Sequence, residues 1–510
     1  MSRSRHRAVA RAASAANLPA IRRDPDLLRS FLSDAAHVPG GTAEGVVFPR
    51  SVDELAAVVR TATRLLAVGA QSSLTGGATP RGDVVVSTRA LSELAQPDGS
   101  TVCAGAGVPL AELQRFLSGR DLYYPPVPTF DGAFVGGTIA TNAAGAATFK
   151  YGMTRDWVVG VTVVLADGSV LDIRRDDVRA SDAGVIEIDT GKGNPISVTI
   201  PTYEVPKLPK VSAGYFTEPH LDLVDLFVGS EGTLGVIASA TLRVKRRPRR
   251  CVALIVCASE AQALAMTTTL RAEAAAVEPL DVAAIEYVDS RSLTLLDDST
   301  FAAAGIPRPR RHQTVLLVQI ETEGDPDTAL GRLDAAVQAA GVVHDPVVAL
   351  PQDERTAARL FELREAVPAA VNARIGAAKV RAGDAIQKMA GDFIVPFEAL
   401  PSALTFYREA FERRDLDYAI WGHISDGNLH PNVIPRSPKD IEKGRDALRE
   451  MARRVMALGG APLAEHGVGR NSLKQEFLRA MYGDRGIEQM RAVKRALDPE
   501  NKLAAGVLFP

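Results

Sequence analysis

Three glycine-rich segments constrain the fold more than any other feature of this sequence. They are residues 68–77, 136–145 and 229–235. Glycine lets a backbone approach another group closely, and consecutive free N–H groups bind anions such as a pyrophosphate. One long ligand, held along its length by backbone, accounts for three such segments better than three unrelated turns. The first half of the chain is therefore expected to enclose an extended, phosphate-bearing ligand.

The first of these segments, 68–77, also carries polar side chains. Gln71 and the two serines that follow it can donate hydrogen bonds to a phosphate. A different segment, 105–110, begins like a dinucleotide fingerprint, but Leu110 stands where the third glycine is required. That glycine permits close packing of helix on strand, so we do not expect a Rossmann NAD site here.

Helical and strand patterns alternate around these segments. Residues 51–54 match a capping box that opens an amphipathic helix at 52–66, ahead of a short apolar strand. Asp167-Gly168 separates two β-rich runs and predicts a hairpin. The other elements expected in this half are strands at 84–86 and 101–104, a helix beginning at Pro109, and two strands within 226–244. The pattern indicates α+β structure.

A basic, proline-containing stretch, 245–250, predicts a domain boundary. The elements expected beyond it are a strand at 252–256, a helix near 260–276, a strand at 315–320, and helices near 328–340, 354–376, 438–458 and 485–497. This order is typical of a second α+β layer domain.

Composition excludes several classes of protein. The length of 510 residues indicates more than one domain. The composition, 46% hydrophobic and 24% charged residues, is typical of folded proteins. The net charge of −2 provides no overall field for nucleic acid. Cys103, Cys251 and Cys257 form no CxxC pair, which fits a reducing compartment. The longest charge-free run, 132–149, is too rich in glycine to span a membrane.

Arginine dominates the N-terminus, because six arginines precede the first acid, Asp24. The segment lacks the apolar core of a secretory signal. A mitochondrial targeting segment is one interpretation, and a frayed basic terminus is the one we favour. We expect a cytoplasmic protein, or one of the mitochondrial matrix if the source is eukaryotic.

The motifs together resemble a known family. Gly76-Gly77 and the segments 136–145, 151–155 and 229–235 are similar to the FAD-binding domain of the vanillyl-alcohol-oxidase flavoproteins. Segments 422–432 and 465–469 are similar to motifs of the FAD-linked 2-hydroxy-acid dehydrogenases, which include D-lactate, glycolate and D-2-hydroxyglutarate dehydrogenases. The resemblance covers roughly residues 45–510, in the family's motif order.

This resemblance implies an α+β fold with a two-subdomain FAD-binding domain, an α+β cap, and a C-terminal segment that returns to the FAD-binding domain. The corresponding divisions are 1–44 for the basic extension with a lead-in helix, 45–247 for FAD binding, 248–455 for the cap and 456–510 for the C-terminal segment.

The same resemblance implies which residues bind FAD. The first segment would bind the pyrophosphate, a second group would lie along the ribityl chain and flavin, and residues 231–237 would lie near the adenine end. The implied set is Val68, Gly69, Ala70, Gln71, Ser72, Ser73, Leu74, Pro128, Gly137, Thr138, Thr141, Asn142, Ala144, Gly145, Glu231, Gly232, Val236 and Ile237. Because no histidine lies in these loops, we expect noncovalent FAD.

Two histidines follow one another closely in the cap. If Asp426-Gly427 is a two-residue turn, His423 pairs with His430, and directly opposed positions lie about 4.5–5.5 Å apart at Cβ. Two imidazoles at that distance can share a metal ion, although a pair of ordinary sheet histidines has the same spacing. The resemblance implies that Glu465 completes a His/His/Glu site for Zn²⁺ or Mn²⁺.

The resemblance also implies catalytic roles. His466 would take the proton of the substrate hydroxyl, Arg364 would hold the substrate carboxylate with its planar fork, and Asn432 would make a polar contact with the substrate. Lys388 falls near a family lysine, but with shifted spacing.

The expected function is oxidation of a D-2-hydroxy acid to the 2-oxo acid by hydride transfer to flavin N5, with metal assistance. The electron acceptor would be a quinone, a cytochrome, an electron-transfer flavoprotein or O₂, and a homodimer is allowed. Three alternatives remain: a non-redox enzyme like alkylglycerone-phosphate synthase, an O₂-using oxidase, and a flavin-free metal hydrolase that uses His423, His430 and Glu465.

Overall fold

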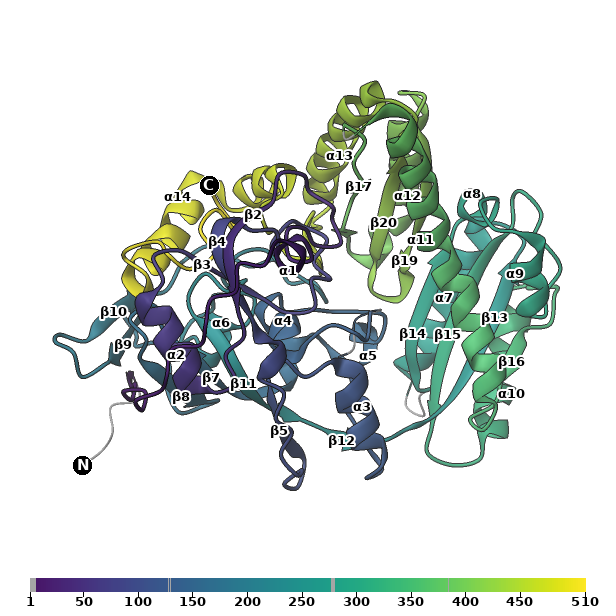
Figure 1. Ribbon diagram of the computed structural model, residues 1–510. Helices are drawn as coiled ribbons and strands as arrows, with labels where there is room; N and C mark the ends of the chain where they lie inside the picture. The colour runs from purple at the N-terminus through teal and green to yellow at the C-terminus, as the bar shows by residue number, and fades with distance from the viewer. Residues whose placement is uncertain (1–5, 127, 129, 277–279, 384) are drawn as a thin grey trace.

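The computed structural model describes residues 6–126, 128, 130–276, 280–383 and 385–510. Two groups of sheets lie side by side, one from the first half of the chain and one from residues 249–434 (Figure 1). The last part of the chain, after residue 457, lies over the first group. Among the described residues, no helix is both long enough and apolar enough to cross a membrane.

The first subdomain is a small parallel sheet in the order β2-β4-β3, formed by β2 (Thr42–Val47), β3 (Leu65–Val68) and β4 (Arg81–Ser87). Its helix α2 (Val52–Thr61) starts where Ser51 accepts the N–H of Glu54, as the capping box predicts. The prediction that this helix reaches residue 66 is wrong. Leu65 and Leu66 are fully buried in β3, because pairing with β4 gives them more burial than another helical turn.

The second subdomain is antiparallel, in the order β5-β11-β7-β8. It contains β5 (Thr101–Gly105), β7 (Val158–Val164), β8 (Val170–Arg174) and β11 (Val236–Arg243). Strands β7 and β8 form the predicted hairpin, with Gly168 at φ +77°. The prediction of two strands within 226–244 is wrong, because the structure has one strand there, β11. Residues before the glycine-rich loop form α6 (Leu223–Phe227), because Asp222 caps the N–H of Val224.

Four short helices and a small strand pair complete this half of the molecule. They are α1 (Pro25–Arg29), α3 (Leu110–Ser118), α4 (Val135–Ala140), α5 (Thr148–Tyr151), β6 (Leu122–Tyr123) and β12 (Lys245–Arg246).

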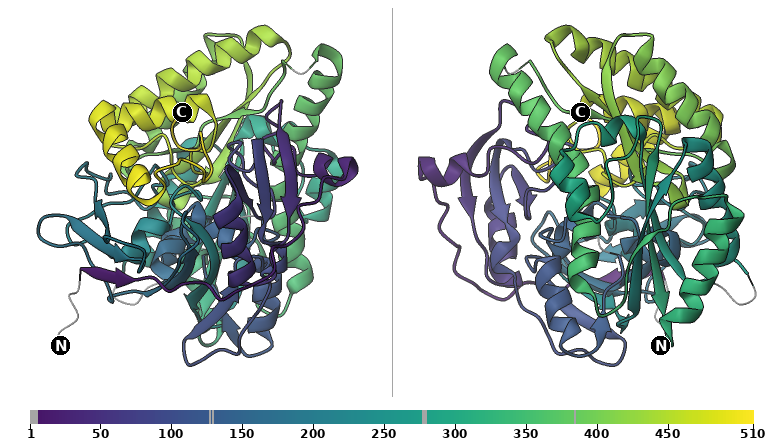
Figure 2. Two further views of the ribbon diagram at one scale, coloured as in Figure 1. Left: turned by 60° about the vertical axis from the view of Figure 1, so that its left-hand side comes forward. Right: turned by 90° about the vertical axis from the view of Figure 1, so that its right-hand side faces the viewer.

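The N-terminal segment is not frayed from residue 7 onward. Strand β1 (Arg7–Val9) adds in parallel to β9 (Val185–Asp189), which pairs with β10 (Ile196–Thr199), as Figure 2 shows at left. Arg7 pairs with Asp189 at 2.5 Å and Arg11 with Asp172 at 2.9 Å. Two of the N-terminal arginines therefore meet acids, one on β9 and one on β8.

The cap is built on an eight-stranded sheet in the order β16-β13-β15-β14-β19-β20-β17, with β18 also paired to β20. Its strands are β13 (Arg249–Cys257), β14 (Val282–Val288), β15 (Thr314–Thr322), β16 (Val347–Ala349), β17 (Met389–Ala390), β18 (Phe393–Ile394), β19 (Asp417–His423) and β20 (Asn428–Ile434). The predicted strands at 252–256 and 315–320 are the cores of β13 and β15.

Helices cover both faces of the cap sheet (Figure 2, right). Alternate residues of β13 face opposite cores: Ala253 and Ile255 lie in the core that contains α7, and Val252 and Leu254 in the core that contains α11. The helices are α7 (Glu260–Ala274), α8 (Ser290–Leu293), α9 (Asp298–Ala303), α10 (Pro326–Ala339), α11 (Glu354–Ala382), α12 (Leu400–Glu412) and α13 (Pro438–Ala457).

The C-terminal segment returns to the first subdomain. After α14 (Ser472–Leu497), the N–H of Leu65 donates to the carbonyl of Lys502 and the N–H of Ala504 donates to that of Leu65, both at 2.8 Å. Residues near 502–504 thereby extend the parallel sheet along β3. This return places the loop at 465–469 between the two halves of the molecule.

Candidate active site

A cavity of about 290 Å³ is enclosed by the three glycine-rich segments. Every residue of the implied FAD set except Asn142 and Gly145 lines it. A Cβ atom on Gly137 would meet nothing within 4 Å, so this glycine leaves cavity space that a side chain would fill. The cavity therefore fits an extended ligand held by backbone, as the glycine pattern predicts.

Asn142 and Gly145 shape the loop beside the cavity. Asn142 has φ +46°, and its side-chain oxygen accepts the N–H of Arg155 at 2.9 Å. The N–H of Gly145 donates to Thr148 Oγ1 at 3.2 Å. In the first loop, the side-chain amide of Gln71 donates to the carbonyls of Ser30 and Ser33, so its amide is not the free phosphate donor that the sequence suggested.

Glu231 connects two distant loops at the wall of this cavity. Its carboxylate accepts the N–H groups of Val468 and Gly469, both at 2.8 Å. Burial raises the pKa of Glu231 to about 7, although the two N–H donors oppose that rise. The side chain thus faces residues next to Glu465 and His466, whereas the sequence interpretation placed Glu231 near an adenine.

The β19–β20 hairpin brings His423 and His430 together in a register that differs from the predicted one. His423 lies opposite Asn428, and His430 lies opposite Trp421, because the turn is a 3₁₀ segment, Ile424–Asp426, followed by left-handed Gly427. The two histidines are therefore diagonal neighbours on one face of the sheet. Their ring centroids are 5.5 Å apart.

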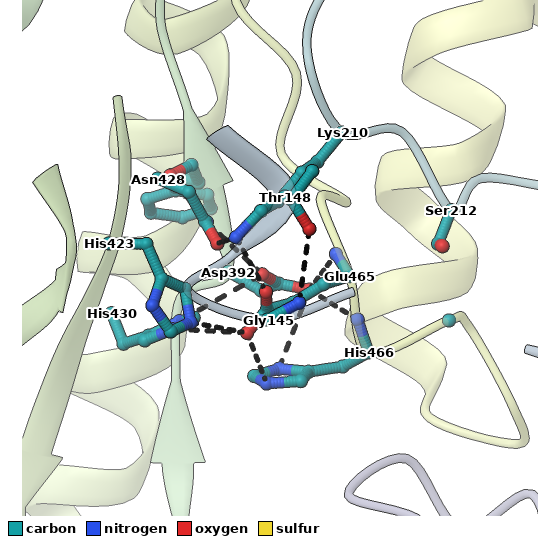
Figure 3. Close-up of polar contacts among 12 residues, drawn as sticks. Gly145, Thr148, Lys210, Ser212, Asp392, His423, Asn428, His430, Glu465 and His466 are labelled. Atoms are coloured by element: carbon teal, nitrogen blue, oxygen red, sulfur yellow. Dashed lines mark hydrogen bonds and ion pairs between the residues drawn. The ribbon is translucent and has the colours of Figure 1, made fainter. Parts of the chain in front are cut away.

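Three histidines converge on one carboxylate oxygen (Figure 3). The Nε2 atoms of His423, His430 and His466 lie 3.4, 3.2 and 3.4 Å from Oε1 of Glu465. Two of these side chains come from the cap hairpin and two from the loop after residue 464. Imidazole nitrogens and a carboxylate oxygen are donors that Zn²⁺ and Mn²⁺ accept, so the donor set fits a divalent cation.

The second nitrogens of the two hairpin histidines differ. Nδ1 of His423 contacts the buried carboxylate of Glu286, which leaves Nε2 to face Glu465. Burial disfavours charge on His423, but Glu286 raises its pKa to about 9, so a cation binding at Nε2 would displace a proton. Burial lowers the pKa of His430 to about 4, and its Nδ1 has no hydrogen-bond partner among the described residues.

Asp392 is a buried acid of this site that sequence reasoning missed as a functional residue. One of its oxygens accepts the N–H of Glu465 at 3.1 Å and that of His466 at 2.9 Å. The same oxygen lies 3.4 Å from Nδ1 of His466 and 3.4 Å from Lys474 Nζ. Donor atoms of Asp392, His430, Glu465 and His466 all lie within 4.8 Å of one another. Because backbone donors already occupy Asp392, we regard it as the support of this loop.

Arg364 lies buried behind the hairpin. Its Nε donates to Glu286 at 2.6 Å and its NH1 to Glu365 at 2.9 Å. Although burial opposes it, the charges of Arg364 and His423 hold the pKa of Glu286 at about 2. No sequence pattern marks Glu286, which lies within an ordinary apolar strand, β14.

A second cavity, of about 450 Å³, adjoins the first. The two share Leu74, Glu465 and His466. The second cavity is also lined by the expected substrate residues Arg364, Asn432 and Lys388, with His423 and His430. Asn432 donates to the carbonyl of His430 at 2.7 Å, and its side-chain oxygen is unpartnered among the described residues.

Positive side chains predominate in this second cavity. Its described lining contains Arg81, Arg364, Lys388, Arg445, Arg470 and Lys474 against two acids, Glu365 and Glu465. Such a lining attracts an anionic small molecule. Burial lowers the pKa of Lys388. The site thus combines a backbone-lined cavity with a cationic one, joined at Glu465 and His466.

Comparison with known proteins defines the class. Residues 43–174 match the model of an FAD binding domain, and residues 246–508 match that of the FAD linked oxidases, C-terminal domain. The second match alone spans more than half of the chain, so the chain belongs to the FAD-linked oxidase family. FAD is therefore its cofactor class.

Curated relatives are similar over nearly the whole chain. The chain is 28% identical to glycolate oxidase subunit GlcD of Bacillus subtilis, covering 91% of this chain and 89% of the relative. It is 27% identical to D-2-hydroxyglutarate dehydrogenase of Stutzerimonas stutzeri, covering 95% of each. A probable mitochondrial D-lactate dehydrogenase of Danio rerio is 27% identical, over 90% and 83%.

Solved structures share the fold. A 4-ethylphenol oxidase from Gulosibacter chungangensis superposes with a TM-score of 0.66 at 16% identity, covering 96% of this chain and 94% of that one. An alkyldihydroxyacetonephosphate synthase superposes with a TM-score of 0.58 at 15% identity, covering 90% and 75%. These similarities confirm the vanillyl-alcohol-oxidase type of fold that the motifs predict.

Proposed function

We propose that the protein is an FAD-dependent dehydrogenase that oxidises a D-2-hydroxy acid of the lactate, glycolate or 2-hydroxyglutarate class to the 2-oxo acid, assisted by Zn²⁺ or Mn²⁺. The observation that carries the proposal is the junction of two cavities at Glu465 and His466. One cavity fits FAD, and the other is cationic and contains the histidines. A hydroxy acid in the second cavity would reach both the cation site and the flavin side of the first.

The residues divide the work by position. His466 takes the proton of the substrate hydroxyl, because among the three described histidines of the cluster it is the one that lines both cavities. Arg364 holds the carboxylate, since Glu286 and Glu365 accept hydrogen bonds from its Nε and NH1, and no described residue accepts one from its NH2. Asn432, which lines the same cavity, makes a polar contact with the substrate.

His423, His430 and Glu465 would hold the cation. When bound, the cation lowers the pKa of the substrate hydroxyl and polarises the ketone product. FAD, when bound, supplies a hydride acceptor at N5. Among the described residues that line the first cavity there is no cysteine or tyrosine, and the one histidine, His466, faces Asp392 and Glu465; we therefore propose noncovalent FAD.

The division of the chain follows from this assignment. We propose residues 1–44 as an extension, 45–247 and 456–510 as the FAD-binding part, and 248–455 as the cap that supplies the two hairpin histidines. The electron acceptor would be a quinone, a cytochrome, an electron-transfer flavoprotein or O₂, the last making the protein an oxidase. A homodimer and a location in the cytoplasm or mitochondrial matrix remain part of the proposal.

Two other activities have less support. A metal hydrolase would use the histidine cluster without the adjoining cavity, and that cavity would then have no role. A non-redox synthase rests on a structural likeness that extends to the fold alone. Both predict that no hydroxy acid changes the visible spectrum.

The decisive experiment is an anaerobic visible spectrum of purified protein, before and after addition of D- and L-2-hydroxy acids. Bleaching of the flavin bands by one D-acid supports the proposal and identifies the substrate. Flavin bands that no hydroxy acid bleaches, with or without added Mn²⁺ or Zn²⁺, contradict it. A chelated sample, restored by each metal in turn, tests the cation separately.

A further inference from the structure

We propose that Lys210, a residue of the FAD-binding domain, is the positioning residue that makes Glu465 a one-oxygen ligand of the cation. The inference rests on the proposed cation site and concerns a residue outside the motifs of the sequence. Lys210 lies between β10 and α6, in a stretch without regular secondary structure. It lines neither cavity, so it acts through Glu465 rather than on a substrate.

Lys210 is fully buried, and among the described residues its ammonium group contacts three side-chain oxygens. Nζ lies 3.0 Å from Oε2 of Glu465, 3.2 Å from Oδ2 of Asp426 and 3.4 Å from Oδ1 of Asn428. The contacts with Glu465 and Asn428 are hydrogen bonds, and the contact with Asp426 is an ion pair. Glu465 is therefore one of the two hydrogen-bond acceptors that hold the ammonium group in place.

The two oxygens of Glu465 consequently have different surroundings (Figure 3). Oε2 faces Lys210, whereas Oε1 faces the Nε2 atoms of His423, His430 and His466 at 3.2–3.4 Å. An oxygen that accepts a hydrogen bond from an ammonium group is a poor ligand for a cation, because the two positive charges would share one oxygen. Glu465 is thus left with one oxygen for the ion, at the point where the histidine nitrogens converge.

The backbone near Lys210 is tied to both parts of the active site. Ser212 Oγ donates to the carbonyls of Thr141 and Asn142 at 3.0 and 3.1 Å, and Thr141 lines the FAD cavity. The N–H of Ser212 donates to the carbonyl of Leu463 at 3.2 Å, two residues before Glu465. Through these bonds Lys210 fixes the Glu465 carboxylate relative to the wall of the FAD cavity.

Asp426 explains how a buried cation can lie next to a metal site. A lone ammonium would be costly to bury and would repel the ion. Asp426 is itself buried and faces the same Nζ, so the Lys210–Asp426 pair is neutral. Lys210 can therefore orient Glu465 without cancelling the attraction of the site for a divalent ion.

The test compares binding of Mn²⁺ to chelated FAD-containing protein by calorimetry, with flavin absorbance as a check on the fold. The variants are Lys210→Met, the double variant Lys210→Met/Asp426→Asn, and the control Lys207→Met in the same stretch. Loss of a group that orients a ligand typically weakens metal binding 10–100-fold, so we expect about that change in both Lys210 variants and none in the control. The double variant removes the unpaired acid, so a role limited to neutralising Asp426 predicts parent-like binding there, which would overturn the inference.

A second measurement does not depend on the folding of any variant. In a crystal structure of the parent protein with Mn²⁺, we expect one oxygen of Glu465 on the ion and the other still hydrogen-bonded to Lys210. Coordination through both oxygens, with Lys210 displaced, would overturn the inference. A parent protein that binds no ion would instead refute the proposed cation site itself, and Lys210 with it.

Discussion

The two parts of the proposed active site, the first cavity and the histidine cluster, are formed by different kinds of residue. The first cavity, the proposed FAD site, is lined mainly by glycine, alanine and short polar residues from one half of the chain, joined by Glu465 and His466. The histidine cluster depends on side-chain atoms from three separate regions: Lys210, the cap hairpin, and the loop at 465–469. The first region depends on space being left open, and the second on particular atoms being present.

This difference determines which substitutions matter. In the cavity, adding atoms should harm binding, because glycines such as Gly137 leave open the space that a ligand would occupy. In the cluster, removing an atom should harm the chemistry, because the histidine nitrogens and the lysine ammonium group converge on one carboxylate, Glu465. The predictions below test this contrast.

Loss of the His466 ring should have the largest effect. We expect His466→Ala to lower turnover of the hydroxy acid by about 10²–10⁴-fold, the usual contribution of a positioned general base. FAD content should stay near that of the parent, since the cavity is formed mainly by other residues. Steady-state kinetics with flavin quantification measures both, and His312→Ala, an exposed position, is the control. Near-normal turnover would remove His466 from the mechanism.

Two adjacent glycines of α4 separate open space from packed space. A Cβ on Gly137 meets nothing within 4 Å, whereas one on Gly136 would lie 2.6 Å from Ala106 Cβ. Gly137→Val should therefore weaken FAD binding about 10–100-fold with little loss of apoprotein stability. Gly136→Ala should destabilise the fold by about 1–3 kcal/mol. Flavin titration and urea unfolding of both variants decide the matter, and equal effects in the two would contradict the contrast.

Arg364→Lys probes the carboxylate contact. Lysine keeps a positive charge beside Glu286 but lacks the planar guanidinium. It therefore cannot hold Glu286 and a substrate carboxylate through separate N–H groups of one rigid plane. We expect KM to rise about tenfold and kcat to change less. A fall confined to kcat would mean that Arg364 acts on the cluster through Glu286 and not on the substrate.

The sequence predicted the backbone-lined region better than the side-chain cluster. Glycine spacing is a local signal, because the close approach it allows is a property of each loop, and the cavity forms where the segments meet. The hairpin histidines were placed together from an incorrect register: a 3₁₀ turn lengthens the loop and makes His423 a diagonal rather than direct neighbour of His430.

Lys210, Glu286 and Asp392 could not be predicted from the sequence as a group. Each stands alone in its own segment, without a spacing that marks it, and only the tertiary structure brings it within reach of the histidines. Glu286 lies within a buried strand of otherwise apolar residues, and Lys210 follows a proline-containing stretch, so neither position carries a recognisable motif. Local patterns identify elements, whereas a cluster assembled across domains depends on how the elements dock.

The smallest expected effect concerns Glu231, the acid that joins the two regions. Its pKa in the folded protein, about 7, lies above the ordinary value of 4.5, so the folded state holds a proton that the unfolded state has lost between these values. The contribution of Glu231 to stability should therefore fall as pH rises from 4.5 to 7. The difference in unfolding free energy between the parent and Glu231→Gln should shrink by on the order of 1 kcal/mol, because a partly accessible side chain is partly screened.

Urea unfolding of the apoprotein at a series of pH values measures this difference, with Glu218→Gln as an exposed control. A constant difference between parent and variant would mean that Glu231 has the same pKa in the folded and unfolded states, so that the folded side chain is ionised at neutral pH. The carboxylate would then hold the N–H groups of Val468 and Gly469 as an anion, and its charge would act on the junction between the FAD cavity and the histidine cluster.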